Sequence, residues 1–176
     1  MVIKIAIVGV MCSGKSTLAN KIIEYYKNNN NIIIQKKAFA DKVYDIAYNL
    51  FNMKNKNRIL LQQIGTKMRE INKNVWIDYT LNNLPDNVII EDCRYENELN
   101  ELIENNFIII KIIIPKNIQL KRLKKTYPTN WKKHTNNLNH ESETNLNKIS
   151  NDNFDFILNY DYDFNYIINI LKKFIN

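Results

Sequence analysis

The chain is best understood from one stretch near its start: Gly9-Val10-Met11-Cys12-Ser13-Gly14-Lys15-Ser16-Thr17. It matches G-x-x-x-x-G-K-[ST], the P-loop, and it follows a short β-branched apolar run at residues 3–8 that reads as a buried strand. In this motif the glycines allow backbone conformations that a Cβ hinders, so that successive N–H groups point at phosphate oxygens at a helix N-terminus. We therefore predict a nucleotide phosphate site formed by Gly9, Met11, Cys12, Ser13, Gly14, Lys15, Ser16 and Thr17.

The composition is that of one folded domain. The 176 residues are 45% hydrophobic and 24% charged, which is enough apolar material for a sizeable core. The net charge of +7 suits phosphate-rich partners, although a general bias toward lysine explains it equally well. The arginines are of more interest, because a planar guanidinium binds phosphate in a bidentate way that lysine does not; they are Arg58, Arg69, Arg94 and Arg122.

The cysteine content and the apolar segments indicate where the protein works. Cys12 and Cys93 are too few for a disulfide framework, so we expect a reducing compartment such as the cytoplasm, that of the host if the protein is viral. The apolar start lacks a signal-peptide cleavage site and is needed as the first strand. The longest apolar run, residues 107–114, is too short to span a bilayer, so we expect no membrane partner.

Apolar runs alternate with helical patterns along the chain. We expect strands at residues 3–8, 32–34, 88–90, 107–114 and 154–158. We expect helices at residues 14–27, 40–51, 57–71, 75–84, 95–105, 117–125 and 164–174, a polar turn at 28–31 and a loop at 127–139. The alternation predicts an α/β fold with a five-stranded parallel sheet and helices on both faces.

P-loop enzymes use an acidic residue to hold their metal ion, and this residue lies at the end of a strand next to the P-loop strand. Asp92 is placed in this way after residues 88–90, and Glu91 is its rival. The alternation of side chains along a strand points these neighbours to opposite faces, so one of the two should serve the metal. We predict that Mg²⁺ is bound by Ser16 and Asp92, the alternative being two ordinary acids at a strand end.

Beyond the P-loop, the chain resembles the viral and bacteriophage deoxynucleoside monophosphate kinases, within the nucleoside monophosphate kinase group. The most specific segment is Asp92-Cys93-Arg94-Tyr95-Glu96-Asn97-Glu98, which is similar to the family's Asp-Val-Arg-Phe-x-Asn-Glu. Cys93 stands where the family has an aliphatic residue. The other matching segments, in the family's order, are the P-loop, residues 39–42, residues 61–69 with Trp76 following, and residues 140–143.

The resemblance implies a three-layer P-loop kinase fold in a single domain, residues 1–176, with acceptor-binding helices at about 38–84 and a lid at about 121–139. It implies transfer of the ATP γ-phosphoryl group to a nucleoside monophosphate, with Lys15, Asp92 and Arg122 as the catalytic residues. Relatives carry more arginine where this lid carries lysine. The implied acceptor-binding residues are Phe39, Asp41, Gln63, Arg69 and Arg94.

Ordinary structural roles compete with several of these assignments. Phe39 would also suit the core, Asp41 a helix N-cap, and Arg69 or Arg122 a solvated helix face. Two other functions stay open from the sequence: a P-loop kinase for another small acceptor or a polynucleotide end, and a basic nucleic-acid-binding NTPase. The leading interpretation implies ATP and a nucleoside monophosphate as partners, no nucleic acid, and allows a homodimer.

Overall fold

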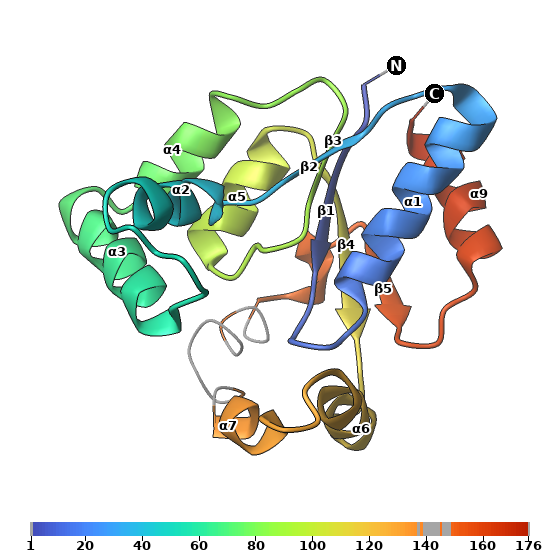
Figure 1. Ribbon diagram of the computed structural model, residues 1–176. Coiled ribbons are helices and arrows are strands. Elements are labelled where there is room, and N and C mark those ends of the chain that lie inside the picture. Colours follow the sequence, from blue (N-terminus) through green and yellow to red (C-terminus); the bar gives the residue numbers. More distant parts are fainter. Residues whose placement is uncertain (1, 137, 139–144, 146–148, 176) are drawn as a thin grey trace.

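The computed structural model describes residues 2–136, 138, 145 and 149–175 (Figure 1). The strands are β1 (Lys4–Val8), β2 (Gln35–Lys37), β3 (Val88–Ile90), β4 (Ile108–Ile113) and β5 (Phe156–Asn159). The helices are α1 (Lys15–Asn30), α2 (Asp41–Asn49), α3 (Arg58–Ile71), α4 (Val75–Leu81), α5 (Glu96–Glu104), α6 (Lys116–Thr126), α7 (Trp131–Asn136) and α9 (Phe164–Phe174), with a 3₁₀ turn, η3 (Asn151–Asn153), before β5.

The five strands form one sheet in the order β2-β3-β1-β4-β5, and every neighbouring pair is parallel. This confirms the predicted α/β architecture. The central strand β1 pairs with β3 through Ile5↔Ile89 and with β4 through Ile5↔Ile108. Parallel strands need helical crossovers, which cover both faces of the sheet. Accordingly, α1 and α9 lie on one side of it and α2 to α5 on the other (Figure 1).

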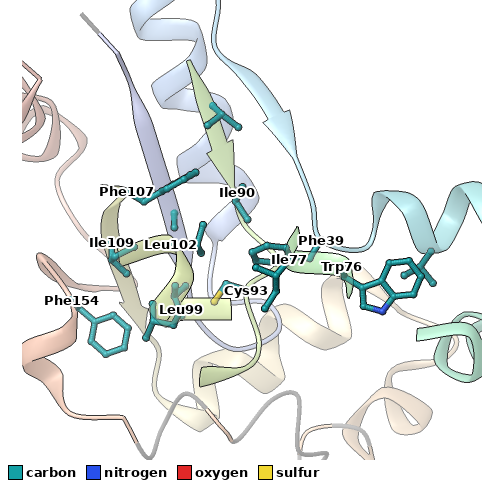
Figure 2. Close-up of a cluster of buried hydrophobic side chains, with 14 of the residues drawn as sticks. Phe39, Trp76, Ile77, Ile90, Cys93, Leu99, Leu102, Phe107, Ile109 and Phe154 are labelled. Atoms are coloured by element: carbon teal, nitrogen blue, oxygen red, sulfur yellow. The ribbon is translucent and has the colours of Figure 1, made fainter. Parts of the chain in front are cut away.

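Side-chain alternation along β1 divides the core in two. Ile5 and Ile7 pack against Leu18 and Ile22 of α1, in the cluster that also contains the apolar face of α9. On the opposite face, a second cluster joins the sheet to α2, α3, α4 and α5, and it includes Phe39, Trp76, Ile77, Ile90, Leu99 and Leu102 (Figure 2). Burying one leucine or isoleucine side chain completely stabilises the folded state by about 1.5–3 kcal/mol. The two clusters therefore stabilise the sheet from both of its faces.

The connection from α1 to β2 differs from the sequence prediction. Helix α1 continues to Asn30 and is closed by Asn31, whose φ of +54° is left-handed and whose N–H donates to the Tyr26 carbonyl. The predicted turn at 28–31 and strand at 32–34 are therefore wrong. Ile33 is 74% exposed, and the edge strand starts at Gln35, which pairs with Val88. Because an edge strand can carry polar residues, the strand at 35–37 has no apolar signal, and the apolar run at 32–34 predicted the wrong position for it.

The segment after α6 also differs from its prediction as a loop. Residues Trp131–Asn136 form α7, beside α6 at one end of the molecule (Figure 1). The buried His134 ring stacks on Tyr127 with centroids 4.0 Å apart, which fixes α7 against the end of α6. Residues 140–143, matched in the resemblance, lie outside the described residues. Among the helices that are described, none is both long and apolar enough to cross a membrane.

Candidate active site

The P-loop joins β1 to α1 and has the backbone that its motif predicts. A Cβ on Gly9 would lie only 2.8 Å from the Ile112 carbonyl oxygen and from Ser13 Oγ, so a side chain there is excluded. Gly14 has a φ of +111° and Cys12 a φ of +62°, both in the left-handed region. The Ser13 N–H donates to the Val10 carbonyl (3.1 Å), which closes the turn of the loop.

Lys15 lies folded back over this loop. Its Nζ donates to the Gly9 carbonyl (2.7 Å) and to the Val10 carbonyl (3.0 Å). The charge is therefore held directly beside the backbone that the motif assigns to phosphate. A bound phosphate would take over some of these contacts.

One cavity of ≈ 600 Å³, here called the P-loop cavity, opens on the outer side of the loop. It contains the predicted nucleotide-binding residues from Cys12 to Thr17. Its positive charge suits a polyphosphate. Its other walls come from α1, α6 and the β5–α9 turn, through Lys21, Arg122, Lys125, Thr126, Tyr160, Asp161 and Tyr162. No sequence pattern indicated that the turn at 160–162 borders this site, because only the order of strands in the sheet brings it to the P-loop.

Arg122 belongs to the P-loop cavity. Its Nη1 donates to the Ser13 carbonyl (2.8 Å) and its Nη2 to the Tyr160 carbonyl (3.2 Å). Its guanidinium also lies over the Tyr160 ring, 5.4 Å from the centroid. The solvated-helix alternative for this residue is therefore wrong, since the side chain ties α6 to the P-loop and to the β5–α9 turn.

A second cavity, here called the α2–α3 cavity, has a volume of ≈ 780 Å³. It brings together most of the predicted acceptor residues with Asp92 and the P-loop residue Met11. The predicted residues in its wall are Phe39, Gln63, Arg69, Asp92 and Arg94. Further walls come from aromatic and basic side chains: Tyr44, Tyr95, Lys56, Arg58 and Lys67.

Asp41 is the predicted acceptor residue that does not line the α2–α3 cavity. Its Oδ2 accepts a hydrogen bond from the Ala38 N–H (2.9 Å), at the start of α2. It lines a smaller cavity of ≈ 230 Å³ instead, with Lys42 and Tyr79. The N-cap alternative is not met either, because Ala40 is the N-cap of α2 and Asp41 is its first residue, whose side chain bonds to the preceding turn.

Asp92 connects the end of β3 to the segment before α2. Its Oδ1 accepts from the Phe39 N–H and its Oδ2 from the Ala40 N–H, both at 3.0 Å. Desolvation raises the pKa of Asp92, while these two amides and the Arg94 charge oppose that rise. The carboxylate therefore holds the backbone of the acceptor segment, a contact that the sequence could not reveal.

Glu91 points to the other face of the sheet, as strand alternation predicts. Its Oε1 pairs with Lys36 Nζ at 2.8 Å. Its Oε2 is buried and has no hydrogen-bond partner within the described part of the chain. Glu91 thus offers a lone oxygen, whereas both oxygens of Asp92 already accept amide hydrogen bonds.

The donor chemistry at the loop fits a magnesium ion. Mg²⁺ prefers oxygen ligands and takes one or two from the protein, the rest from phosphates and water. The Ser16 hydroxyl borders the P-loop cavity, and Asp92 and Glu91 supply carboxylates after the neighbouring strand. Among the described residues there is no group of three or more His, Cys, Asp or Glu side chains that could hold a metal.

Glu98 is the residue of this region that the sequence analysis quoted but gave no role. Its side chain is only 3% exposed, and it borders the α2–α3 cavity. Its Oε2 accepts from the N–H groups of Arg94 (2.6 Å) and Tyr95 (3.1 Å), and its Oε1 lies 3.6 Å from Arg69 Nη2. Burial raises the pKa of Glu98 to about 7. Its place three residues after Tyr95, as in a capping box, was the available signal.

Comparisons with known proteins concern the family and the fold of the chain. A family model described as an AAA domain matches residues 5–145. No curated protein sequence matches the chain. Solved structures share its fold at low sequence identity. They include an uncharacterized protein from Eubacterium ventriosum, with 16% identity, a TM-score of 0.54 and coverage of 99% of this chain and 98% of that one.

Two further structures are kinases by name. A gluconokinase from Sinorhizobium meliloti is 11% identical, with a TM-score of 0.53, and the match covers 95% of this chain and 87% of that one. A shikimate kinase from Bacteroides thetaiotaomicron is 10% identical, with a TM-score of 0.50 and 99% coverage of both chains. At such identities the likeness shows the fold alone, which is that of P-loop kinases.

Proposed function

Because this chain belongs to the AAA domain family and has a P-loop kinase fold, we propose that it transfers the γ-phosphoryl group of ATP to a nucleoside monophosphate. The products are ADP and the nucleoside diphosphate. The reaction needs in-line positioning of the two nucleotides and neutralisation of their charge, and little covalent chemistry from the protein.

One observation carries the proposal: neighbouring residues of the P-loop border both cavities. Cys12 borders the P-loop cavity, and its neighbour Met11 borders the α2–α3 cavity. A donor whose phosphates lie on the loop therefore has its terminal phosphoryl group near the mouth of the second cavity. Arg69 and Arg94 in that cavity offer two guanidinium groups to an acceptor phosphate.

The lining of the α2–α3 cavity favours a nucleotide as the acceptor. The aromatic residues Tyr44 and Tyr95 border it and offer apolar surface to a base, whereas Phe39, which also borders it, is 3% exposed and belongs to the core. Its volume of ≈ 780 Å³ is within the range of cavities that hold drug-sized ligands. Shikimate and gluconate, to judge from the names of two structural neighbours, are the smaller acceptors against which this assignment must be tested.

The proposed roles of the residues follow from their places. Lys15 contacts the donor phosphates, Arg122 borders the donor nucleotide, and Arg69 and Arg94 bind the acceptor phosphate. A bound Mg²⁺ would neutralise phosphate charge. We propose Ser16 and Asp92 as its ligands, with Glu91, which also follows β3, as the rival of Asp92. We retain as proposals an acceptor-binding segment at about 38–84 and a lid at about 121–139.

The test is an ADP-release screen with purified protein, ATP and Mg²⁺. The acceptors are the common ribonucleoside and deoxyribonucleoside monophosphates, with shikimate and gluconate as competing candidates and water as the blank. We expect at least one monophosphate to raise ADP release well above the blank, with a diphosphate product seen by chromatography. Turnover with shikimate or gluconate alone would contradict the nucleotide acceptor, and stimulation only by DNA would favour the nucleic-acid-dependent NTPase.

A further inference from the structure

Glu98 is a buried acid that the proposed reaction leaves without a function. It lies in the first turn of α5 with 3% of its side chain exposed. Burying a carboxylate is costly unless hydrogen bonds and opposite charges compensate. The compensation here comes from the two segments that supply the acceptor-site arginines.

One oxygen of Glu98 organises the turn that carries Arg94. Oε2 accepts from the consecutive N–H groups of Arg94 (2.6 Å) and Tyr95 (3.1 Å), between β3 and α5. Hydrogen bonds to a carboxylate are among the stronger ones in proteins. This turn, and with it the direction in which the Arg94 side chain leaves the backbone, depends on Glu98.

The other oxygen faces the second arginine. Oε1 lies 3.6 Å from Arg69 Nη2, while Arg69 Nη1 donates to the Gly65 carbonyl (3.2 Å). The guanidinium also lies 4.8 Å from the centroid of the Tyr95 ring. Arg69 is therefore held from three sides at the wall of the α2–α3 cavity, before any ligand arrives.

We propose that Glu98 is a positioning residue for the acceptor phosphate: one carboxylate oxygen fixes the turn of Arg94 and the other orients Arg69 toward the same cavity. The inference rests on the proposed function and adds to it the device that pre-orients the two arginines. Pre-orientation matters because a long side chain otherwise loses rotamer freedom when the ligand binds.

The ionised form of Glu98 is the one that orients Arg69. The groups that face it are Asp92, Cys93, Arg94 and Tyr95 from the β3–α5 turn, and Arg69 from α3. Because Oε2 accepts two amide hydrogen bonds, a proton added to this carboxyl would lie on Oε1. It would then meet the N–H of Arg69, donor against donor, and the contact of Glu98 with Arg69 would be lost, which leaves Arg69 held only by Gly65 and Tyr95 among the contacts described above.

The first experiment compares Glu98→Gln, Glu98→Asp and the control Glu104→Gln, which changes an exposed acid of the same helix. At pH 8 we expect Glu98→Gln to raise the KM of the acceptor about tenfold, with the KM of ATP within about twofold of wild type. Glu98→Asp, which keeps the charge, should recover part of the loss. An unchanged acceptor KM, or an equal rise for ATP, would overturn the proposal.

Two further readouts separate positioning from a purely structural role. Between pH 8 and pH 6 the acceptor KM of wild type should rise more steeply than that of Glu98→Gln, which follows only the titration of the phosphate. In an Arg69→Ala background, Glu98→Gln should raise the acceptor KM by a clearly smaller factor than in wild type. Parallel pH profiles together with full additivity would contradict the role.

A binding measurement keeps this inference distinct from the proposed function. If wild type transfers phosphate to no monophosphate, the proposed function has failed, and inorganic phosphate is then titrated calorimetrically into protein saturated with ADP. Binding about tenfold weaker in Glu98→Gln than in Glu104→Gln would still support the positioning role. Equal dissociation constants would overturn it.

Discussion

Arg122 of α6 donates a hydrogen bond from its Nη1 to the carbonyl of Ser13 in the P-loop, at 2.8 Å. This contact bridges residues 109 positions apart in the chain and joins the start of the proposed lid to the donor site. The resemblance implied a catalytic role for Arg122 within a lid at about 121–139. Its place over the P-loop instead favours a role on the donor side.

We therefore predict that Arg122→Ala raises the KM of ATP by about tenfold while changing the KM of the acceptor little. The variant should also be less stable, by about 1–3 kcal/mol, because the Ser13 and Tyr160 carbonyls lose a charged donor. Steady-state kinetics with each substrate varied in turn, and urea unfolding, measure both effects. Lys121→Ala, an exposed neighbour on α6, is the matched control. A fall in kcat with both KM values unchanged would instead indicate that Arg122 stabilises the transition state of phosphoryl transfer.

Lys15→Ala should fold and lose turnover. The Lys15 ammonium donates to carbonyls of its own loop, and the residue belongs to neither of the two hydrophobic clusters, so we expect the core to form without it. Removing one preorganised contact to a transferring phosphoryl group costs on the order of 10²–10³ in rate. Circular dichroism and thermal unfolding check the fold, and the ADP-release assay checks the rate. Near-normal turnover in the folded variant would refute the function assigned to the P-loop.

Asp92→Asn should impair the protein more than Glu91→Gln. The asparagine would set an NH₂ group against the N–H of Phe39 or Ala40, where the carboxylate accepts from both. The lost hydrogen bond and the unsatisfied amide should cost about 1–3 kcal/mol of stability and displace the acceptor segment. Urea unfolding and the Mg²⁺ dependence of turnover distinguish the two variants. If Glu91→Gln has the higher Mg²⁺ requirement, Glu91 is the metal ligand and Asp92 is an anchor of the backbone.

The stability of the protein should fall as the pH rises through the range in which Glu98 titrates. In the folded state its pKa is raised to about 7, whereas 4.5 is its ordinary value. Between these values the folded state holds a proton that the unfolded state has lost, so a higher pH favours unfolding. At about 1.4 kcal/mol per pKa unit, Glu98 contributes up to about 3 kcal/mol to this loss.

Glu98→Gln has no titrating group at this position, so its unfolding free energy should decline less than that of wild type between pH 5 and pH 8. Urea titrations at both values measure this, with Glu104→Gln as the control. Equal declines in both proteins would mean that Glu98 is ionised in the folded state throughout.

Local pattern was sufficient for a fully buried strand and for a helix with a regular apolar face. Strand Val88–Ile90 and helix Phe164–Phe174 have the predicted bounds, because a continuous apolar run and a sustained helical period leave no competing interpretation. Strand β2 was displaced by three residues, since an edge strand is defined by its partner rather than by its own hydrophobicity. Helix α7 was missed because its stabilising contact is the stacking of His134 on Tyr127, and not an apolar stripe.

Some residues of the candidate site could likewise be predicted from local sequence, and others depend on tertiary contacts. The P-loop was visible because its function is carried by consecutive residues with special backbone angles. Among the four arginines, the resemblance singled out Arg69 and Arg94 as acceptor residues, and the structure places both at one cavity. The contacts of Asp92 with the segment before α2, and of Arg122 with the P-loop, depend on tertiary pairing. Residue type alone could not have distinguished an anchor from a ligand.

The folded-back position of Lys15 has a consequence for selectivity. Its ammonium already has two carbonyl partners, at 2.7 and 3.0 Å, so ligand binding exchanges one set of acceptors for another. A hydrogen bond from Lys15 to a neutral oxygen of a ligand is no stronger than its present hydrogen bonds to the two carbonyls. A doubly or triply charged phosphate accepts a stronger one, because charge on the acceptor strengthens the hydrogen bond. The P-loop thereby discriminates against uncharged ligands through the charge of Lys15, in addition to the shape of the cavity.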